Sequence, residues 1–298
     1  MRFTIAIPTY NNFKTIKKSI DSCLNQDYTE PFEVLVVNNA STDDTDKLLD
    51  SFGDKITRFS NDTTVSLFEN HNVCIRQAKG DYVVFCHSDD QLLPDALSKY
   101  HLILEKRGFP NKYVLWGRSM FRDFYHNWNN GGFQLNQIAS GYSAISVFHI
   151  GGITPSGTCY SKESFLDFGG FFEMKDKVTP SDQTTMWALC LNAFEFEMAD
   201  RVFFIRELAS TAHSLNNKLY LDSYQGALDV LITKLDERDL KVIISNLLSF
   251  KNNFNPILIN ALIQKKITTK NQVRRLILKY LLKNPSFFVR VQYLKLLF

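Results

Sequence analysis

The stretch Asp81–Pro94, DYVVFCHSDDQLLP, joins a short apolar strand to two adjacent carboxylates. Tyr82–Cys86 has the β-branched and aromatic content of a buried strand. Asp89 and Asp90 follow directly, and burying carboxylates without partners is costly. In an open α/β sheet, ligands bind just beyond the carboxyl ends of the strands. Two carboxylates at this position therefore predict a site for a divalent cation and for a polyanion that needs it.

Strand and helix patterns alternate around this stretch. Besides Tyr82–Cys86, strands are predicted at Phe3–Ile7, Phe32–Val37, Lys55–Phe59, Tyr113–Arg118 and Arg201–Ile205. Helices are predicted after the first two strands, near Leu67–Lys79 and at Asp95–Lys106. This order favours right-handed βαβ units and a mainly parallel sheet.

Local signals suggest how the helices begin and end. Asn11 or Asn12 is expected to cap the first helix, and Ser41, Thr42 or Asp43 the second. Gly80 is expected to follow the third helix as its C′ glycine.

Three loops follow strands of the predicted parallel sheet. They are Pro8–Asn12, Asn38–Thr42 and His87–Asp90. Because parallel strands end at the same edge, we expect these loops to lie together, at the place where a nucleotide would bind.

The second half of the chain is less regular. Arg122–Gly141 contains FYHNWNNGGF and is expected to be a loop, either solvated or in contact with a sugar. Gly151–Tyr160 and Phe165–Phe172 suggest strands and turns. A helix is predicted within TPSDQTTMWALCLNAF, where Asp182 in the first turn could simply complement the helix dipole.

Charge is distributed unevenly along the 298 residues. The net charge is +3, but residues 241–298 contain eleven Lys or Arg and no acidic residue, which leaves −8 for residues 1–240. A basic tail on an acidic body indicates an anionic partner for the tail, either a membrane or a nucleic acid.

The five cysteines lack CxxC spacing and lie mostly in apolar segments, as reduced packing residues do in a cytoplasmic protein. The N-terminal apolar run is too short for a signal peptide, and no apolar run is long enough to predict a transmembrane helix.

Five motifs in order resemble those of family 2 glycosyltransferases. IAIPTYNN and VLVVNNASTDDT are similar to the family's first two strands and loops, and DYVVFCHSDD to its metal-binding DXD stretch. FGGFFE resembles its acceptor-side glycine turn, and PSDQTTMW its catalytic helix. The resemblance implies a GT-A fold, a Rossmann-like α/β architecture with a mainly parallel sheet flanked by helices. It places a glycosyltransferase domain at residues 1–224, with a nucleotide-sugar half (1–120) and an acceptor half (121–224). The composition turns helical from about Tyr224 and predicts a C-terminal helical extension at 225–298.

The resemblance also implies roles for individual residues. Those that would contact the nucleotide-sugar are Pro8, Thr9, Tyr10, Asn39, Asn72, Ser88 and Asp89. Asn39 occupies a position where the family often has an aspartate that accepts a hydrogen bond from the nucleotide base. An amide oxygen can accept the same bond without charge, so the identity of the base stays open. His71 and His87 replace a common arginine and a common aspartate, and their roles stay open between a phosphate contact and a pocket wall.

The resemblance further implies an inverting single displacement. Asp182 matches the catalytic base, and Asp90 the metal ligand, with His213 as a second residue that could reach the metal or the diphosphate. The cation is expected to be Mn²⁺ or Mg²⁺, because carboxylate and diphosphate oxygens are hard ligands. The donor would be a nucleoside-diphosphate sugar.

The resemblance ends near residue 224, and the tail shows a different pattern. Val273, Leu276, Ile277, Tyr280 and Leu281 form an apolar stripe beside basic residues, as in a helix that lies in a membrane interface. This predicts a cytoplasmic enzyme, peripheral on the cytoplasmic face of the membrane, that modifies a polyprenyl-linked or oligosaccharide acceptor during synthesis of a bacterial surface polysaccharide such as O-antigen. The alternative is that the stripe packs on the catalytic domain or on a second subunit of a homodimer. Nucleic-acid binding is disfavoured by the acidic body.

Two other functions are compatible with parts of the sequence. A catalytically silent subunit that binds a sugar nucleotide or a glycan would explain Asn38, Asn39, His71 and His87. A nucleotidyltransferase on a similar sheet would normally carry a glycine-rich loop where this chain has PTYNN.

Overall fold

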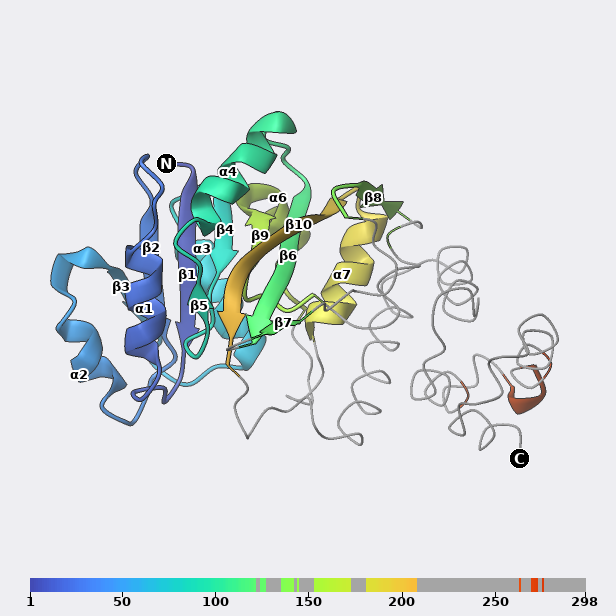
Figure 1. Ribbon diagram of the computed structural model, residues 1–298. Coiled ribbons are helices and arrows are strands. Elements are labelled where there is room, and N and C mark those ends of the chain that lie inside the picture. Colours follow the sequence, from blue (N-terminus) through green and yellow to red (C-terminus); the bar gives the residue numbers. More distant parts are fainter. Residues whose placement is uncertain are drawn as a thin grey trace.

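A central mixed sheet with helices on both faces organises the protein (Figure 1). The computed structural model describes residues 1–121, 124–126, 135–141, 144, 153–172, 181–207, 263, 269–272 and 275. The strands are β1 (Phe3–Thr9), β2 (Glu33–Asn38), β3 (Thr57–Ser60), β4 (Tyr82–Phe85), β5 (Gln91–Leu92), β6 (Tyr113–Phe121), β7 (Phe124–His126), β8 (Ile138–Ser140), β9 (Thr158–Ser161) and β10 (Glu195–Arg206). The helices are α1 (Ile16–Leu24), α2 (Thr45–Asp50), α3 (Leu67–Gln77), α4 (Ala96–Lys106), α6 (Lys162–Phe168) and α7 (Ser181–Leu191), with a 3₁₀ turn, η1, at Gly53–Lys55.

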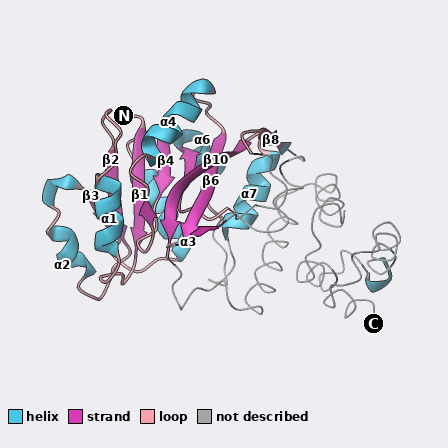
Figure 2. Cartoon of the chain, viewed as in Figure 1, coloured by secondary structure: helices cyan, strands magenta, loops and turns pink. Residues whose placement is uncertain are grey.

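The sheet is parallel in its first half and mixed in its second. The strand order is β3-β2-β1-β4-β9-β6-β10-β5, with β7 paired to β6 and β8 to β10. β1 to β4 pair in parallel, whereas β9 runs antiparallel to both β4 and β6. Helices cover the sheet on both faces (Figure 2). The α/β fold class is therefore confirmed, but the expectation of a mainly parallel sheet holds only for β1 to β4 and for the β6–β10 pair.

Strand residues alternate between two hydrophobic cores because successive side chains point to opposite faces. Phe3, Ile5 and Ile7 of β1 pack into the core beneath α1, α2 and α4. Ala6 and the alternate residues of β2 and β4 pack into the core beneath α3, α6 and α7. The two layers of helices hold the central strands in place, and they thereby fix the positions of the loops beyond the carboxyl ends of these strands.

Several local expectations for helix ends were wrong. The side chains of Asn11 and Asn12 do not cap α1, whose N-cap residue is Thr15. The N-cap residue of α2 is Asp44 rather than an earlier residue. Helix α3 ends at an extended Ala78, so Gly80 is not its C′ residue. A Cβ at Gly80 would meet the Phe3 and Thr4 backbone, so close packing against β1 is what requires glycine there.

The irregular second half also departs from expectation. Lys162–Phe168 is helix α6 rather than strand and turn, and it ends at Gly169 with a φ of 104°. Its phenylalanines suggested a strand from sequence, but Phe165 is buried on one face of a short amphipathic helix. The segment expected to be a loop, residues 122–141, contributes β7 and β8, which pair with the long strands β6 and β10. Long strands offer backbone groups that such short segments can satisfy.

Among the described residues, no helix is both long and apolar enough to cross a membrane. The extension at 225–298 falls almost wholly outside the described residues, so its amphipathic pattern stays a prediction.

Candidate active site

The loops after β1, β2 and β4 lie together, as the sequence predicts. The Asn39 backbone N–H donates to Thr9 O at 2.9 Å and joins the first two loops. The Asn12 side-chain amide donates to Ser88 Oγ at 2.6 Å and joins the first loop to the third. These bonds place polar groups from three strands at one edge of the sheet.

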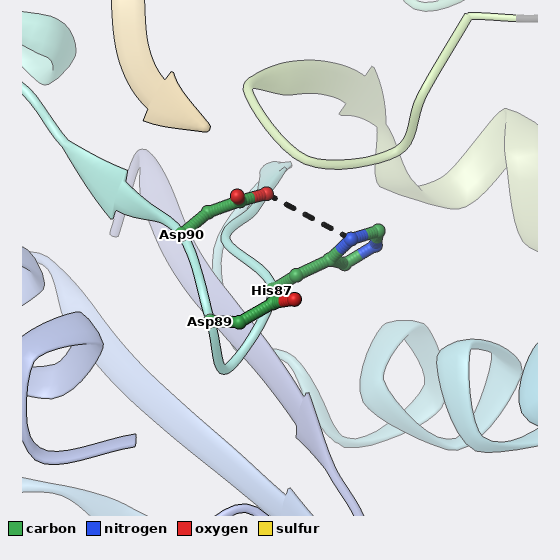
Figure 3. A group of neighbouring side chains, drawn as sticks. All are labelled: His87, Asp89 and Asp90. Carbon is green, nitrogen blue, oxygen red and sulfur yellow. Dashed lines mark ion pairs between the residues drawn. The ribbon is translucent and has the colours of Figure 1, made fainter. Parts of the chain in front are cut away.

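A cluster of three possible ligands lies directly after β4. His87, Asp89 and Asp90 each offer an atom within 4.8 Å of those of the other two (Figure 3). The tight turn that returns Asp90 toward His87 is closed by the Asp90 N–H, which donates to His87 O at 3.0 Å. We call these three residues the cation cluster.

Asp90 is the buried member of the cation cluster, with 3% of its surface exposed. Burial raises the pKa of its carboxyl to about 7, and the hydrogen bond from Ser156, which lowers it, offsets this only in part. The Glu207 N–H donates to Asp90 Oδ1 at 3.1 Å. A buried carboxylate that local hydrogen bonds do not fully stabilise favours a bound cation. One imidazole and two carboxylates form a donor set that suits Mn²⁺ or a similar ion.

The two other members of the cation cluster are half-buried. Burial, and then the charge of Arg206, lower the pKa of His87 to about 4. Burial is also the main cause that raises the pKa of Asp89. His87 is therefore neutral at neutral pH, and its ring offers a nitrogen lone pair.

Three further residues surround the cation cluster that the sequence patterns did not identify. Ser156, fully buried, accepts the His87 backbone N–H at 3.1 Å. Arg206 is the last residue of β10 and Glu207 follows it, and the Arg206 charge acts on all three members of the cluster. A charged pair after a buried strand is the same signal that identified Asp89 and Asp90, and it could have identified these residues.

The residues expected to contact the nucleotide differ in their surroundings. Thr9 Oγ1 is buried and has no hydrogen-bond partner among the described residues, and Pro8 precedes it in β1. Tyr10 leaves 45% of its surface exposed, so its ring is available for stacking. Ser88 Oγ accepts from Asn12 and is buried.

Asn39 and Asn72 use their side chains within the protein. Asn39 Oδ1 accepts from Val65 N and Asn61 Nδ2, each at 2.9 Å, and its amide donates to Val65 O. Asn72 Oδ1 accepts from Phe171 N at 2.8 Å, and its amide donates to Phe171 O at 2.9 Å. Asn72 thus ties α3 to the turn before α7. The expected contacts of both residues with the nucleotide stay predictions.

Asp182 lies in the first turn of α7 and is half-buried. Burial raises the pKa of Tyr160, and the negative charge of Asp182 raises it further, so Asp182 lies within electrostatic range of this β9 residue. β9 pairs with β4, the strand that leads to the cation cluster. The other predicted metal residue, His213, lies outside the described residues.

A separate hollow of about 740 Å³ lies between residues 11–15 and 42–44, which lead into α1 and α2. No member of the cation cluster lines it. We therefore base the site on the cluster rather than on this hollow.

Comparisons of structure identify the fold. TarS 1-349 of Staphylococcus aureus in complex with UDP-GlcNAc superposes with a TM-score of 0.68, at 20% identity, over 93% of this chain and 84% of that one. A mannosyltransferase of Pyrobaculum calidifontis in complex with GDP-Man and Mn²⁺ superposes with a TM-score of 0.60 and 17% identity. The superposition covers 99% of this chain and 83% of the mannosyltransferase chain. The α/β sheet with its cation cluster after β4 is thus the GT-A fold of glycosyltransferases.

Comparisons of sequence give the family. Residues 4–139 match the model for glycosyl transferase family 2, and this part of the chain belongs to that family. An uncharacterized protein of Mycobacterium tuberculosis is 39% identical over 97 residues, 32% of this chain and 30% of that protein. The poly(ribitol-phosphate) beta-N-acetylglucosaminyltransferase TarS of S. aureus is 31% identical over 142 residues, 41% of this chain and 24% of TarS. The chain therefore spans less than a third of the length of either relative.

Proposed function

We propose that this protein is an inverting, metal-dependent glycosyltransferase that moves a sugar from a nucleoside-diphosphate sugar to an acceptor hydroxyl. The observation that carries the proposal is the cation cluster at the carboxyl end of β4, beside the loops of β1 and β2. A diphosphate leaving group needs its developing charge neutralised. A cation held by the cluster would supply that neutralisation.

The chain's own residues would divide the remaining work. The exposed ring of Tyr10 and the unsatisfied hydroxyl of Thr9 would bind the nucleoside. Asp89 would contact the ribose, and Arg206 would add positive charge near the diphosphate. These contacts would hold the anomeric carbon in a fixed orientation toward the acceptor half of the domain.

Asp182 would act as the general base. It takes the proton of the acceptor hydroxyl while that oxygen forms a bond to the anomeric carbon from the face opposite the diphosphate. The bond between the anomeric carbon and the diphosphate oxygen breaks, its electrons leave with the diphosphate, and the configuration inverts. The position of Asp182 on α7, separate from the cation cluster after β4, suits this division.

We further propose a UDP-sugar donor, with UDP-GlcNAc tested first, because TarS is both a sequence relative and a structural neighbour. GDP-mannose is the alternative that the second structural neighbour suggests. The acceptor would be a lipid-linked or oligosaccharide glycan in surface polysaccharide synthesis. The basic C-terminal extension would hold the enzyme on the cytoplasmic face of the membrane, where such an acceptor lies.

The test measures release of free nucleoside diphosphate from each sugar donor in Mn²⁺, with and without glycan acceptors. Slow hydrolysis that an acceptor accelerates is expected, and Asp182→Asn should abolish acceptor-dependent release while nucleotide binding is retained. Tight donor binding without any release would instead favour a catalytically silent subunit. Full turnover by Asp182→Asn would remove that residue from the role of base.

A further inference from the structure

Two histidines that the sequence left unexplained contact one another at the edge of the cation cluster. His71 from α3 and His87 after β4 place their Nε2 atoms 3.1 Å apart, with the rings nearly perpendicular at 88°. The contact joins the buried interior to the cation cluster, because His71 is only 2% exposed.

The hydrogen bonds determine which ring nitrogen carries each proton. His71 Nδ1 lies 2.8 Å from Leu67 O, and since a carbonyl oxygen only accepts, Nδ1 must carry the proton. The ring of His71 is buried among phenylalanine rings, where a charged imidazolium would be costly, so the ring is neutral and its Nε2 bears a lone pair. That lone pair can only accept, and His87 Nε2 must therefore donate to it.

The other ring nitrogen of His87, Nδ1, faces the cation cluster. A neutral His87 that donates from Nε2 bears its lone pair on Nδ1. Figure 3 shows this side of the ring turned toward Asp90, whose Oδ2 lies 3.9 Å from Nδ1. That separation is too long for a hydrogen bond. A nitrogen lone pair therefore faces a carboxylate oxygen at a spacing that one shared cation can bridge.

Packing holds His71 in this arrangement. Its ring contacts the rings of Phe68, Phe85 and Phe171, with centroids 5.5, 5.1 and 5.7 Å away. The ring cannot turn over without breaking the bond to Leu67 O. His71 is thus positioned as a partner that orients a metal-binding histidine, the role that carboxylates or carbonyls usually fill.

We propose that His71 fixes the tautomer of His87 so that His87 Nδ1 is a nitrogen ligand in the cation site that Asp89 and Asp90 form. A mixed nitrogen and oxygen donor set favours transition ions such as Mn²⁺ and Co²⁺ over Mg²⁺, which prefers oxygen ligands. The inference rests on the proposed function, because the nucleoside diphosphate completes the site. The sequence left the cation open between Mn²⁺ and Mg²⁺, and a nitrogen ligand favours Mn²⁺.

Pulsed electron paramagnetic resonance of Mn²⁺ with UDP tests the nitrogen ligand directly. Protein labelled with ¹⁵N in histidine alone should show coupling between Mn²⁺ and one directly bound ¹⁵N. His87→Asp, which supplies a carboxylate instead, should bind Mn²⁺ without this coupling and should lower the ratio of Mn²⁺ to Mg²⁺ affinity about tenfold or more. His213→Asn removes the other histidine that the sequence predicts near the metal, and it should keep the coupling if His87 is the nitrogen ligand.

Variants of His71 test its role as a positioning residue. His71→Leu removes the acceptor and should weaken Mn²⁺ affinity about 10- to 100-fold, with loss of the ¹⁵N coupling. His71→Gln keeps an acceptor oxygen, so its Mn²⁺ affinity and its ¹⁵N coupling should be close to those of the wild type. If His71→Leu does not fold, the wild-type, His87→Asp and His213→Asn spectra still decide the ligand.

The outcomes separate this inference from the proposed function. Binding of Mn²⁺ and UDP without histidine coupling, or coupling that survives in His87→Asp and is lost in His213→Asn, would overturn the nitrogen ligand and leave the proposed function standing. Failure of any nucleoside diphosphate to bind with Mn²⁺ would overturn the proposed function as well.

Discussion

Asp90→Asn should stabilise the cation-free protein at alkaline pH while it removes cation binding. Burial raises the pKa of the Asp90 carboxyl to about 7 in the folded protein. In an unfolded chain, the pKa of an aspartate carboxyl is about 3.9. Between these values the folded state binds more protons than the unfolded state, so stability is lost as the pH rises.

The two pKa values set the size of the effect. Relative to a fully protonated Asp90, the raised pKa lowers the stability of the folded state by about 4 kcal/mol at pH 8 and by about 1–2 kcal/mol at pH 5, where Asp90 is still protonated in the folded protein and only the unfolded chain ionises. An asparagine keeps an oxygen to accept from Glu207 N and Ser156, and its amide can face the lone pair of His87. The stability of Asp90→Asn relative to wild type should therefore rise by about 2–3 kcal/mol between pH 5 and pH 8.

Urea denaturation in EDTA at both pH values measures this difference. Asp54→Asn, at an exposed carboxylate in η1, is the matched control and should follow the wild-type dependence on pH. Parallel pH profiles for wild type and Asp90→Asn would refute the view that Asp90 is a carboxylate held at a cost for a cation.

Further predictions concern the segments that support the site. Gly157→Ala should lower the free energy of unfolding in urea by about 2–4 kcal/mol, because φ is 68° and the added Cβ would overlap the Phe204 ring. Gly53→Ala shares a positive φ of 52° but has no atom within 4 Å, so it should cost only the backbone strain, about 1 kcal/mol, and an equal loss in both would contradict the overlap. Asn72→Ala should cost about 1–3 kcal/mol through the lost bonds to Phe171, with UDP affinity measured by calorimetry unchanged. A large loss of UDP affinity without a loss of stability would show instead that Asn72 contacts the nucleotide.

The parallel half of the sheet was predictable because local sequence determines it. β1, β2 and β4 are short β-branched runs, each followed by polar residues, and parallel pairing then brings their loops to one edge. Asp89 and Asp90 could be assigned to a site on that basis before any contact was known.

The rest depends on tertiary contacts that one sequence does not reveal. β9 is only four residues long, and its antiparallel pairing with β4 and β6 joins segments that are distant in sequence. The His71–His87 contact depends on how α3 packs on β4, and Ser156 reaches His87 from a distant segment. The bonds of the Asn39 and Asn72 side chains to the backbone of Val65 and Phe171 likewise depend on tertiary packing.

Calorimetric titration with UDP can show whether the cation cluster belongs to a nucleotide-sugar site. UDP should bind in Mn²⁺ and EDTA should abolish the binding. Asp90→Asn should weaken UDP binding, whereas Asp182→Asn should not. UDP and GDP affinities that are absent, or that change neither with Mn²⁺ nor with Asp90→Asn, would contradict the assignment of His87, Asp89 and Asp90 to a nucleotide-sugar site.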